Sequence, residues 1–180
     1  DISLSSVTFE ADSSLNTIGN YAFDGAGLIT VFAEQSLITD KGWDINYNFG
    51  GKTGVNFVEQ TAPTISGTTI ATNNSTATVT FSEAVVNTNG DALQEIDFLL
   101  SISSGIATVA PTPSSISISG DEYTLGLNLT GTPSGAEILT ILPYSATTIY
   151  DAAGNPASIT QSNNTINLIE KIVPIIASTT

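Results

Sequence analysis

Carboxylates and side-chain amides are the groups in this sequence whose chemistry suits metal binding. The chain has 17 acidic residues against 3 basic ones, and it lacks both His and Cys, so a metal site here would use oxygen ligands alone. Calcium is a hard cation that prefers such oxygens. Oxygen-bearing side chains stand close to turn-forming residues at five positions, which are Glu83, Asp97, Asp121, Asp151 and Asn155.

Two interpretations of these oxygens stay open. In the first, Glu83, Asp97, Asp151 and Asn155 converge in space to hold calcium, because no Asp-x-Asp-x-Asp or EF-hand loop places ligands along the chain. In the second, Asp151 accepts backbone N–H groups inside a tight turn, Asp151-Ala152-Ala153-Gly154-Asn155, where short polar side chains and a glycine are typical.

The residue types needed for acid–base or nucleophilic catalysis are largely missing. Without His or Cys, neither a Ser–His nor a Cys–His pair can form. Asp121 and Glu122 offer the two carboxylates of a glycosidase, but neighbours on a strand point to opposite faces and would not share a pocket. We therefore expect no enzymatic activity, and no cofactor other than the candidate calcium.

The charge of the chain narrows its partners. A formal net charge of −14 repels phosphate backbones and anionic lipid, so we expect no nucleic-acid binding and no membrane-surface binding. No apolar run approaches the ~20 residues that span a bilayer, so we expect no membrane insertion. A chain without Cys, Met or His suits an exposed location, and we expect an extracellular or cell-surface protein.

Most of the chain has the pattern of short β-strands separated by turns. Residues 76–81 alternate polar and apolar, which places Ala77, Val79 and Phe81 on one face. Residues 115–119 and 123–129 alternate in the same way, with Gly120-Asp121 as a turn between them, and further strands are expected at 137–142 and 165–168. No segment has a helical period with caps. The fold class is therefore all-β, and residues 57–170 form one β-sandwich domain.

Two distant stretches of the chain are similar to each other. FVEQTAPTISGTT at 57–69 matches LIEKIVPIIASTT at 168–180 with an offset of 168 − 57 = 111 residues. The identities are Glu59/Glu170, Pro63/Pro174, Ile65/Ile176, Thr68/Thr179 and Thr69/Thr180. This spacing is close to the ~100 residues of an immunoglobulin-like sandwich.

Three stretches carry a resemblance to a known family. APTISGTTI from residue 62, VTFSEAV at 79–85 and IYDAAGNPAS at 149–158 resemble bacterial immunoglobulin-like (Ig-like) domains of the SwmB and Big types, which occur in tandem on surface proteins. The resemblance covers about residues 61–172. It implies an Ig-like sandwich that serves as a stalk, adhesion or surface-layer module without enzymatic activity, and some related domains bind calcium near inter-domain junctions.

Residues 1–56 have a different pattern. The stretch SLNTIGNYAFDGAGLITV resembles the leucine-rich repeats of bacterial BspA-type surface proteins, in which a strand and a turn stack apolar side chains onto the next coil. An ordinary β-hairpin is the alternative. In the leucine-rich-repeat interpretation, Trp43, Tyr47 and Phe49 cap the last coil, and residues 50–54 form a linker.

The tail, residues 171–180, is too apolar to be left in water. Ile172, Val173, Ile175 and Ile176 form a run without alternation, which suits a strand that is covered on both faces. Three outcomes are open. The tail begins another Ig-like repeat, folds back on its own domain, or adds a strand to a neighbouring copy.

These observations predict a function in assembly. We expect a non-enzymatic extracellular structural or adhesive protein, a subunit or segment of a repetitive stalk or filament joined end to end by β-strand contacts. Its partners would be copies of itself or adjacent repeats of the same chain. The alternative is a calcium-dependent carbohydrate-binding or adhesion module, with a glycan or surface ligand stacked on Trp43, Tyr47, Tyr144 or Tyr150.

Overall fold

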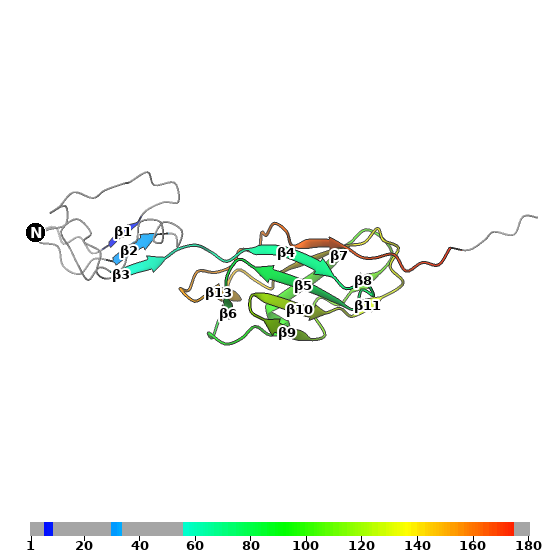
Figure 1. Ribbon diagram of the computed structural model, residues 1–180, viewed down its shortest axis with the longest axis horizontal. Helices are drawn as coiled ribbons and strands as arrows, with labels where there is room; N and C mark the ends of the chain where they lie inside the picture. The colour runs from blue at the N-terminus through cyan, green and yellow to red at the C-terminus, as the bar shows by residue number, and fades with distance from the viewer. Residues whose placement is uncertain (1–5, 9–29, 34–55, 175–180) are drawn as a thin grey trace, which may run out of the picture. The chain divides into compact units, whose positions relative to one another are not determined.

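A computed structural model describes residues 6–8, 30–33 and 56–174 of the chain (Figure 1). These residues form strands, turns and one short 3₁₀ helix, and no α-helix occurs among them. The predicted all-β class is confirmed. By compactness the chain divides into two units, Asp1–Thr61 and Ala62–Thr180.

The first unit has a small parallel sheet in the order β1-β2-β3. Its strands are β1 (Ser6–Thr8), β2 (Thr30–Ala33) and β3 (Asn56–Glu59). Ser6 is opposite Thr30, and Thr30 is opposite Asn56, so successive strands are offset by 30 − 6 = 24 and 56 − 30 = 26 residues. The expected aromatic cap of Trp43, Tyr47 and Phe49 lies outside the described residues.

The second unit begins with a four-stranded antiparallel sheet in the order β4-β5-β10-β9. Its strands are β4 (Ile65–Ile70), β5 (Thr76–Phe81), β9 (Ile116–Ser119) and β10 (Glu122–Gly126). The alternation in β5 places Ala77, Val79 and Phe81 in the interior, as predicted. Val79 is opposite Tyr123, and a tight turn through Gly120 (φ 59°) joins β9 to β10.

A second antiparallel sheet has the order β14-β12-β7. It consists of β7 (Phe98–Ser103), β12 (Ile138–Pro143) and β14 (Thr165–Asn167). Two pairs of short strands flank the sheets, and the 3₁₀ helix η1 (Glu95–Asp97) precedes β7. The pairs are β6 (Val85–Asn87) with β13 (Ile149–Asp151), and β8 (Thr108–Val109) with β11 (Leu129–Thr130).

One hydrophobic cluster forms the core of the second unit, and both sheets contribute to it. Tyr123 of the first sheet packs edge-on against Phe81 with ring centroids 5.6 Å apart, and it also contacts Phe98 of the second sheet. Leu125 and Ile141 are fully buried. Each such side chain contributes about 1.5–3 kcal/mol through its removal from water, so the position of the strands in this unit is fixed mainly by the core.

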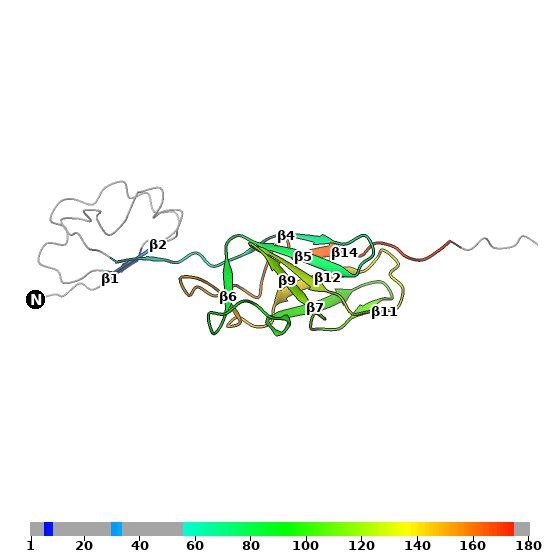
Figure 2. The same cartoon turned by 60° about the horizontal axis from the view of Figure 1, so that its bottom comes forward.

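The first and last strands of the second unit lie side by side, although they belong to different sheets. β4 and β14 neighbour each other in both views (Figures 1 and 2). The chain enters the unit at the start of β4 and leaves it after β14, at the opposite end of the unit (Figures 1 and 2).

Candidate functional site

The turn after β13 is organised by the carboxylate of Asp151. Its Oδ1 accepts the backbone N–H of Asn155 at 2.8 Å, and its Oδ2 accepts the side-chain Nδ2 of Asn155, also at 2.8 Å. The backbone closes around the same two residues, since Asp151 N donates to Asn155 O at 3.1 Å. Gly154 (φ 93°) provides the left-handed residue of the turn. Asp151 therefore has the turn-forming role that its sequence context predicted.

A second turn, after β6, repeats this geometry with the acid and the amide exchanged. Asn87 Oδ1 accepts the backbone N–H of Asp91 at 3.1 Å, and Asn87 N donates to Asp91 O at 2.9 Å. Gly90 (φ 80°) takes the place of Gly154. The two turns, 87–91 and 151–155, are named the twin turns below. Sequence reasoning singled out only the second, although Asn-x-x-Gly-Asp and Asp-x-x-Gly-Asn have the same spacing.

An open pocket of about 590 Å³ lies between the twin turns. Tyr150 is half-buried within it. The remaining lining is small or polar, and consists of Val86, Asn87, Thr88, Gly90, Asp151, Ala152, Ala153 and Gly154. None of these residues is cationic, so the pocket suits a neutral or positively charged group better than an anion.

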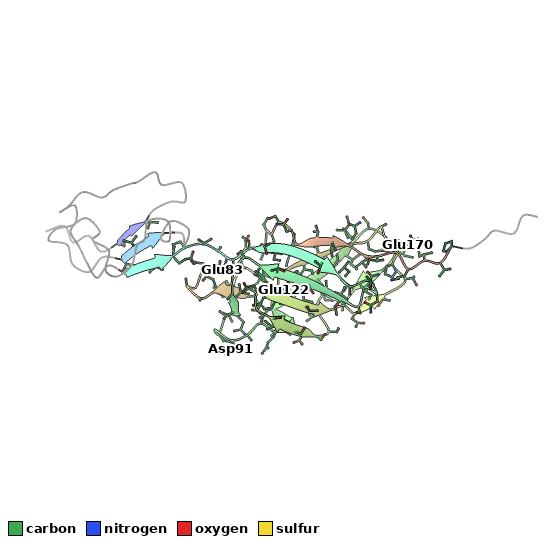
Figure 3. The ribbon with its side chains drawn as sticks, viewed as in Figure 1. Glu83, Asp91, Glu122 and Glu170 are labelled. Carbon is green, nitrogen blue, oxygen red and sulfur yellow. The ribbon has the colours of Figure 1, made fainter. Side chains whose placement is uncertain are left out.

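The structure gathers three of the four predicted calcium ligands. A carboxylate oxygen of Glu83 lies within 4.8 Å of one of Asp151, and Asn155 is hydrogen-bonded to Asp151. Figure 3 shows Glu83 at the end of the second unit where the chain enters. Two carboxylates at this distance repel each other unless a cation lies between them. Part of the oxygen chemistry that calcium requires is therefore present here.

Asp97 and Asp121 have other places in the fold. Asp97 is buried at the end of η1, where its Oδ2 accepts the backbone N–H of Gln94 at 2.7 Å. Its backbone carbonyl accepts the N–H of Tyr144 at 2.8 Å. Asp97 does not belong to the group that contains Glu83 and Asp151. Asp121 is exposed in the β9–β10 turn.

A buried carboxylate that sequence reasoning missed lies at the other end of the unit. Glu137 has no exposed surface and accepts hydrogen bonds from Ile106 N, Ala107 N and Ser134 N at 2.8, 3.1 and 2.9 Å. Burial alone would raise the pKa of Glu137. The N–H groups of Ala107, Ile106 and Ser134 outweigh that effect and lower the pKa from 4.5 to about 2. Glu137 is thus a structural anion that joins two loops.

The exit segment 168–171 is fixed at this same end of the unit. Leu168 is buried, and its N–H donates to Glu137 O at 3.0 Å, while Lys171 N donates to Pro133 O at 2.8 Å. Beyond it, Ile172 and Val173 of the predicted assembly strand are 42% and 77% exposed. Ile175 and Ile176 lie outside the described residues.

The remaining candidates for sugar stacking differ in their surroundings. Tyr144 is 61% exposed, whereas Tyr150 lines the pocket between the twin turns. Among the described residues, no helix is long and apolar enough to cross a membrane. The chain matches no known protein-family model, no curated protein and no solved structure.

Proposed function

We propose that this chain is a non-enzymatic segment of a repetitive extracellular stalk or filament, and that its second unit is an Ig-like sandwich. The order of the strands supports the Ig-like assignment. In Ig constant-type domains, strands A, B, E and D form one sheet and strands G, F and C form the other. The orders β4-β5-β10-β9 and β14-β12-β7 match this arrangement strand for strand.

The single observation that carries the proposal is where the repeated sequence falls in the fold. Its first copy spans β3, the last strand of the first unit, then a short linker, then β4, the first strand of the second unit. Its second copy begins directly after β14, the last strand of the second unit. Asn56 and Asn167 extend the match by one residue toward the N-terminus. The repeat is therefore a junction cassette, made of an exit strand, a linker and an entry strand.

The junction cassette favours tandem repeats over donation of a strand to a separate copy. In the first copy, Pro63 and Ile65 are buried, and β4 pairs with β5 along its length. Pro174 and Ile176 occupy the matching positions of the second copy. A β4-like segment needs a β5-like partner, and β5 of this unit is already paired with its own β4. The proposed partner of the tail is thus a following unit with the same opening.

Two further features fit an array. The chain enters and leaves the second unit at opposite ends, so successive units joined by cassettes would follow one another in line (Figures 1 and 2). In the first unit, parallel strands offset by 24 and 26 residues fall within the 20–29-residue period of leucine-rich repeats, which supports the proposed coil.

Electron microscopy of the native surface material tests this proposal. Antibodies raised against the 180-residue chain should label extended assemblies with a regular axial repeat. Labelling confined to compact, isolated particles would exclude an end-to-end array. The purified chain should also be examined by analytical ultracentrifugation, since tandem joining predicts a monomer, whereas strand donation predicts concentration-dependent chains.

A calcium-dependent binding module is the second candidate, and the pair of Glu83 and Asp151 is the observation that favours it. A calcium ion between the two carboxylates would remove their repulsion, and the adjacent pocket with Tyr150 offers a surface for a neutral carbohydrate. In this case calcium, and not magnesium, should raise the Tm of the chain relative to EDTA, and Asp151→Asn should abolish the rise. Equal melting in calcium and EDTA would eliminate the module and leave the proposed array untouched.

A further inference from the structure

The entry strand and the exit segment of the second unit are joined by side chains and not by a continuous backbone ladder. β4 and β14 lie in different sheets, yet hydrogen bonds connect the two segments at three levels. Ile65 N donates to Gln161 Oε1 at 2.8 Å, and Thr68 Oγ1 donates to Asn163 O at 2.6 Å. The third level is Asn74 with Ile169.

Asn74 holds the backbone of Ile169 with both ends of its amide. Its Nδ2 donates to Ile169 O at 2.7 Å, and its Oδ1 accepts Ile169 N–H at 2.9 Å. The side chain reproduces in this way the paired contacts that a neighbouring strand would make. Asn74 is only 2% exposed, so these bonds are shielded from competing water. We name this contact the Asn74 clasp.

The turn between β4 and β5 holds Asn74 in the conformation that the clasp requires. Asn74 has φ 60°, in the left-handed region that Asn tolerates better than most residues. Its backbone N–H donates to Ala71 O at 2.8 Å. The other side of the clasp is also fixed, because the exit segment is bound to Glu137 O and Pro133 O. Both partners are therefore positioned before any load is applied.

The direction of these contacts decides how they respond to force. Residues 65, 68 and 74 contact residues 161, 163 and 169 in the same order, so the two segments run parallel. The chain is attached at the start of the first segment and beyond the end of the second (Figure 1). Tension between the two attachments would slide the segments past each other and load all three levels together, whereas a peeling force would break them one at a time.

We infer that the Asn74 clasp, with the contacts at Ile65 and Thr68, is a mechanical clamp that resists unfolding when the second unit is pulled by its ends. The biological use of the clamp rests on the proposed array, in which tension passes from unit to unit. The clamp itself is a property of one unit and is measured without any assembly. A failed force experiment and a failed search for filaments therefore remain distinguishable.

Single-molecule force spectroscopy on the full chain tests the inference. The sequence has no Cys, so Gln60→Cys and Val173→Cys, both at exposed positions, supply unique attachment points for an end-to-end pull. A second pair, Asn89→Cys and Ser119→Cys, applies tension along a segment that contains neither Asn74 nor Ile169. The clasp is removed by Asn74→Gly, which keeps the left-handed backbone without strain.

Asn74→Gly should raise the unfolding rate at fixed force about 10-fold or more in the end-to-end pull, since two shielded hydrogen bonds of ~1 kcal/mol each are lost. The rate between the second pair of attachments should change far less. Asn163→Gly is the matched control, because Asn163 has the same φ of 60° and an exposed side chain. It should leave both rates near those of the unmodified chain.

Two results would overturn the clamp. One is an unchanged end-to-end rate in Asn74→Gly, and the other is an equal acceleration in both directions of pull, which would mark a general loss of stability. If Asn74→Gly does not fold, Thr68→Val provides the same comparison, because it removes the bond to Asn163 O with little change in shape. Its expected effect is smaller, in keeping with one bond, but it should have the same directional preference.

Discussion

Glu137 Oε1 accepts the backbone N–H of Ala107 at 3.1 Å, across 30 residues of sequence and without any contact with solvent. The bond requires the ionised carboxylate, and the surrounding N–H groups lower its pKa from 4.5 to about 2. A depressed pKa means that the folded protein binds the proton less readily than the unfolded chain does. The contribution of Glu137 to stability is therefore complete above pH 4.5 and is lost as the pH falls toward 2.

We predict that Glu137→Gln lowers the Tm at pH 7 and flattens the acid limb of the stability curve. The amide keeps the size of the side chain but presents one acceptor oxygen in place of two, so at least one N–H of the two loops loses its partner. Thermal melts of both proteins from pH 7 to 2, followed by circular dichroism, check this. The two curves should converge toward the acid end, and parallel curves would mean that other groups dominate acid unfolding.

Gly105 is predicted to be intolerant of any side chain. A Cβ at this position would lie 2.3 Å from the carboxylate of Glu137, and the residue has φ 66°. Gly120 is the matched control, with φ 59° and nothing within 4 Å of its Cβ position. Gly120→Ala should cost only the ~1–2 kcal/mol of a left-handed alanine. Gly105→Ala should cost clearly more, as measured by urea denaturation, and equal costs would contradict the close packing around Glu137.

The junction cassette makes a prediction about interchangeable sequence. Replacing Ala62-Pro63-Thr64-Ile65-Ser66 by the tail sequence Val-Pro-Ile-Ile-Ala, through Ala62→Val, Thr64→Ile and Ser66→Ala, should give a second unit that folds with a similar Tm. Pro63 and Ile65, the buried residues, are kept, while Thr64 and Ser66 are exposed. The Ser66 Oγ bond to Thr80 O is the main loss.

The control for this chimera is Ile65→Ser in the unmodified chain. It places a small polar side chain in a fully buried position, where a large-to-small change costs ~2–5 kcal/mol. A chimera that unfolds as readily as this control would show that the tail cannot serve as an entry strand. The junction interpretation of the repeat would then be abandoned.

The twin turns should respond alike to loss of their capping side chains. Asn87→Ala and Asp151→Ala each leave backbone N–H groups without a partner in a buried turn, and each should cost ~1–3 kcal/mol. Asn89→Ala, at an exposed position of the first turn, should change stability by less than ~0.5 kcal/mol. Chemical denaturation in EDTA checks all three without interference from calcium. A negligible effect of Asp151→Ala would leave ligand binding as the better account of that carboxylate.

The strands that the sequence predicted best are those whose alternation reports burial directly. Val79 and Phe81 face the core because every second residue of β5 does so. The alternation at 123–129 was interpreted as one strand, but β10 ends at Gly126. A Cβ there would lie 2.4 Å from Ser115 Oγ, so the backbone is in close contact with the preceding loop. Alternation predicts the facing of residues but not where a close approach ends the strand.

The candidate site was predictable only in part. The context Asp151-Ala152-Ala153-Gly154-Asn155 indicates a turn because its signals are consecutive in sequence. The approach of Glu83 to Asp151 depends on strands that are far apart in the chain, and so does the burial of Glu137. Asp97 was grouped with the site for its residue type alone, and its carboxylate caps η1. Single residues with long-range partners leave no periodic trace.

The placement of the cassette across unit boundaries has a consequence for how such a protein changes in length. In the proposed array, every junction is encoded by nearly the same short stretch, and the folded body lies wholly between two of these stretches. Unequal recombination at the matching stretches would insert or delete an entire body in the correct reading frame, without disturbing any core. A lineage could thus adjust the reach of its stalk in fixed increments while each body stays as it is.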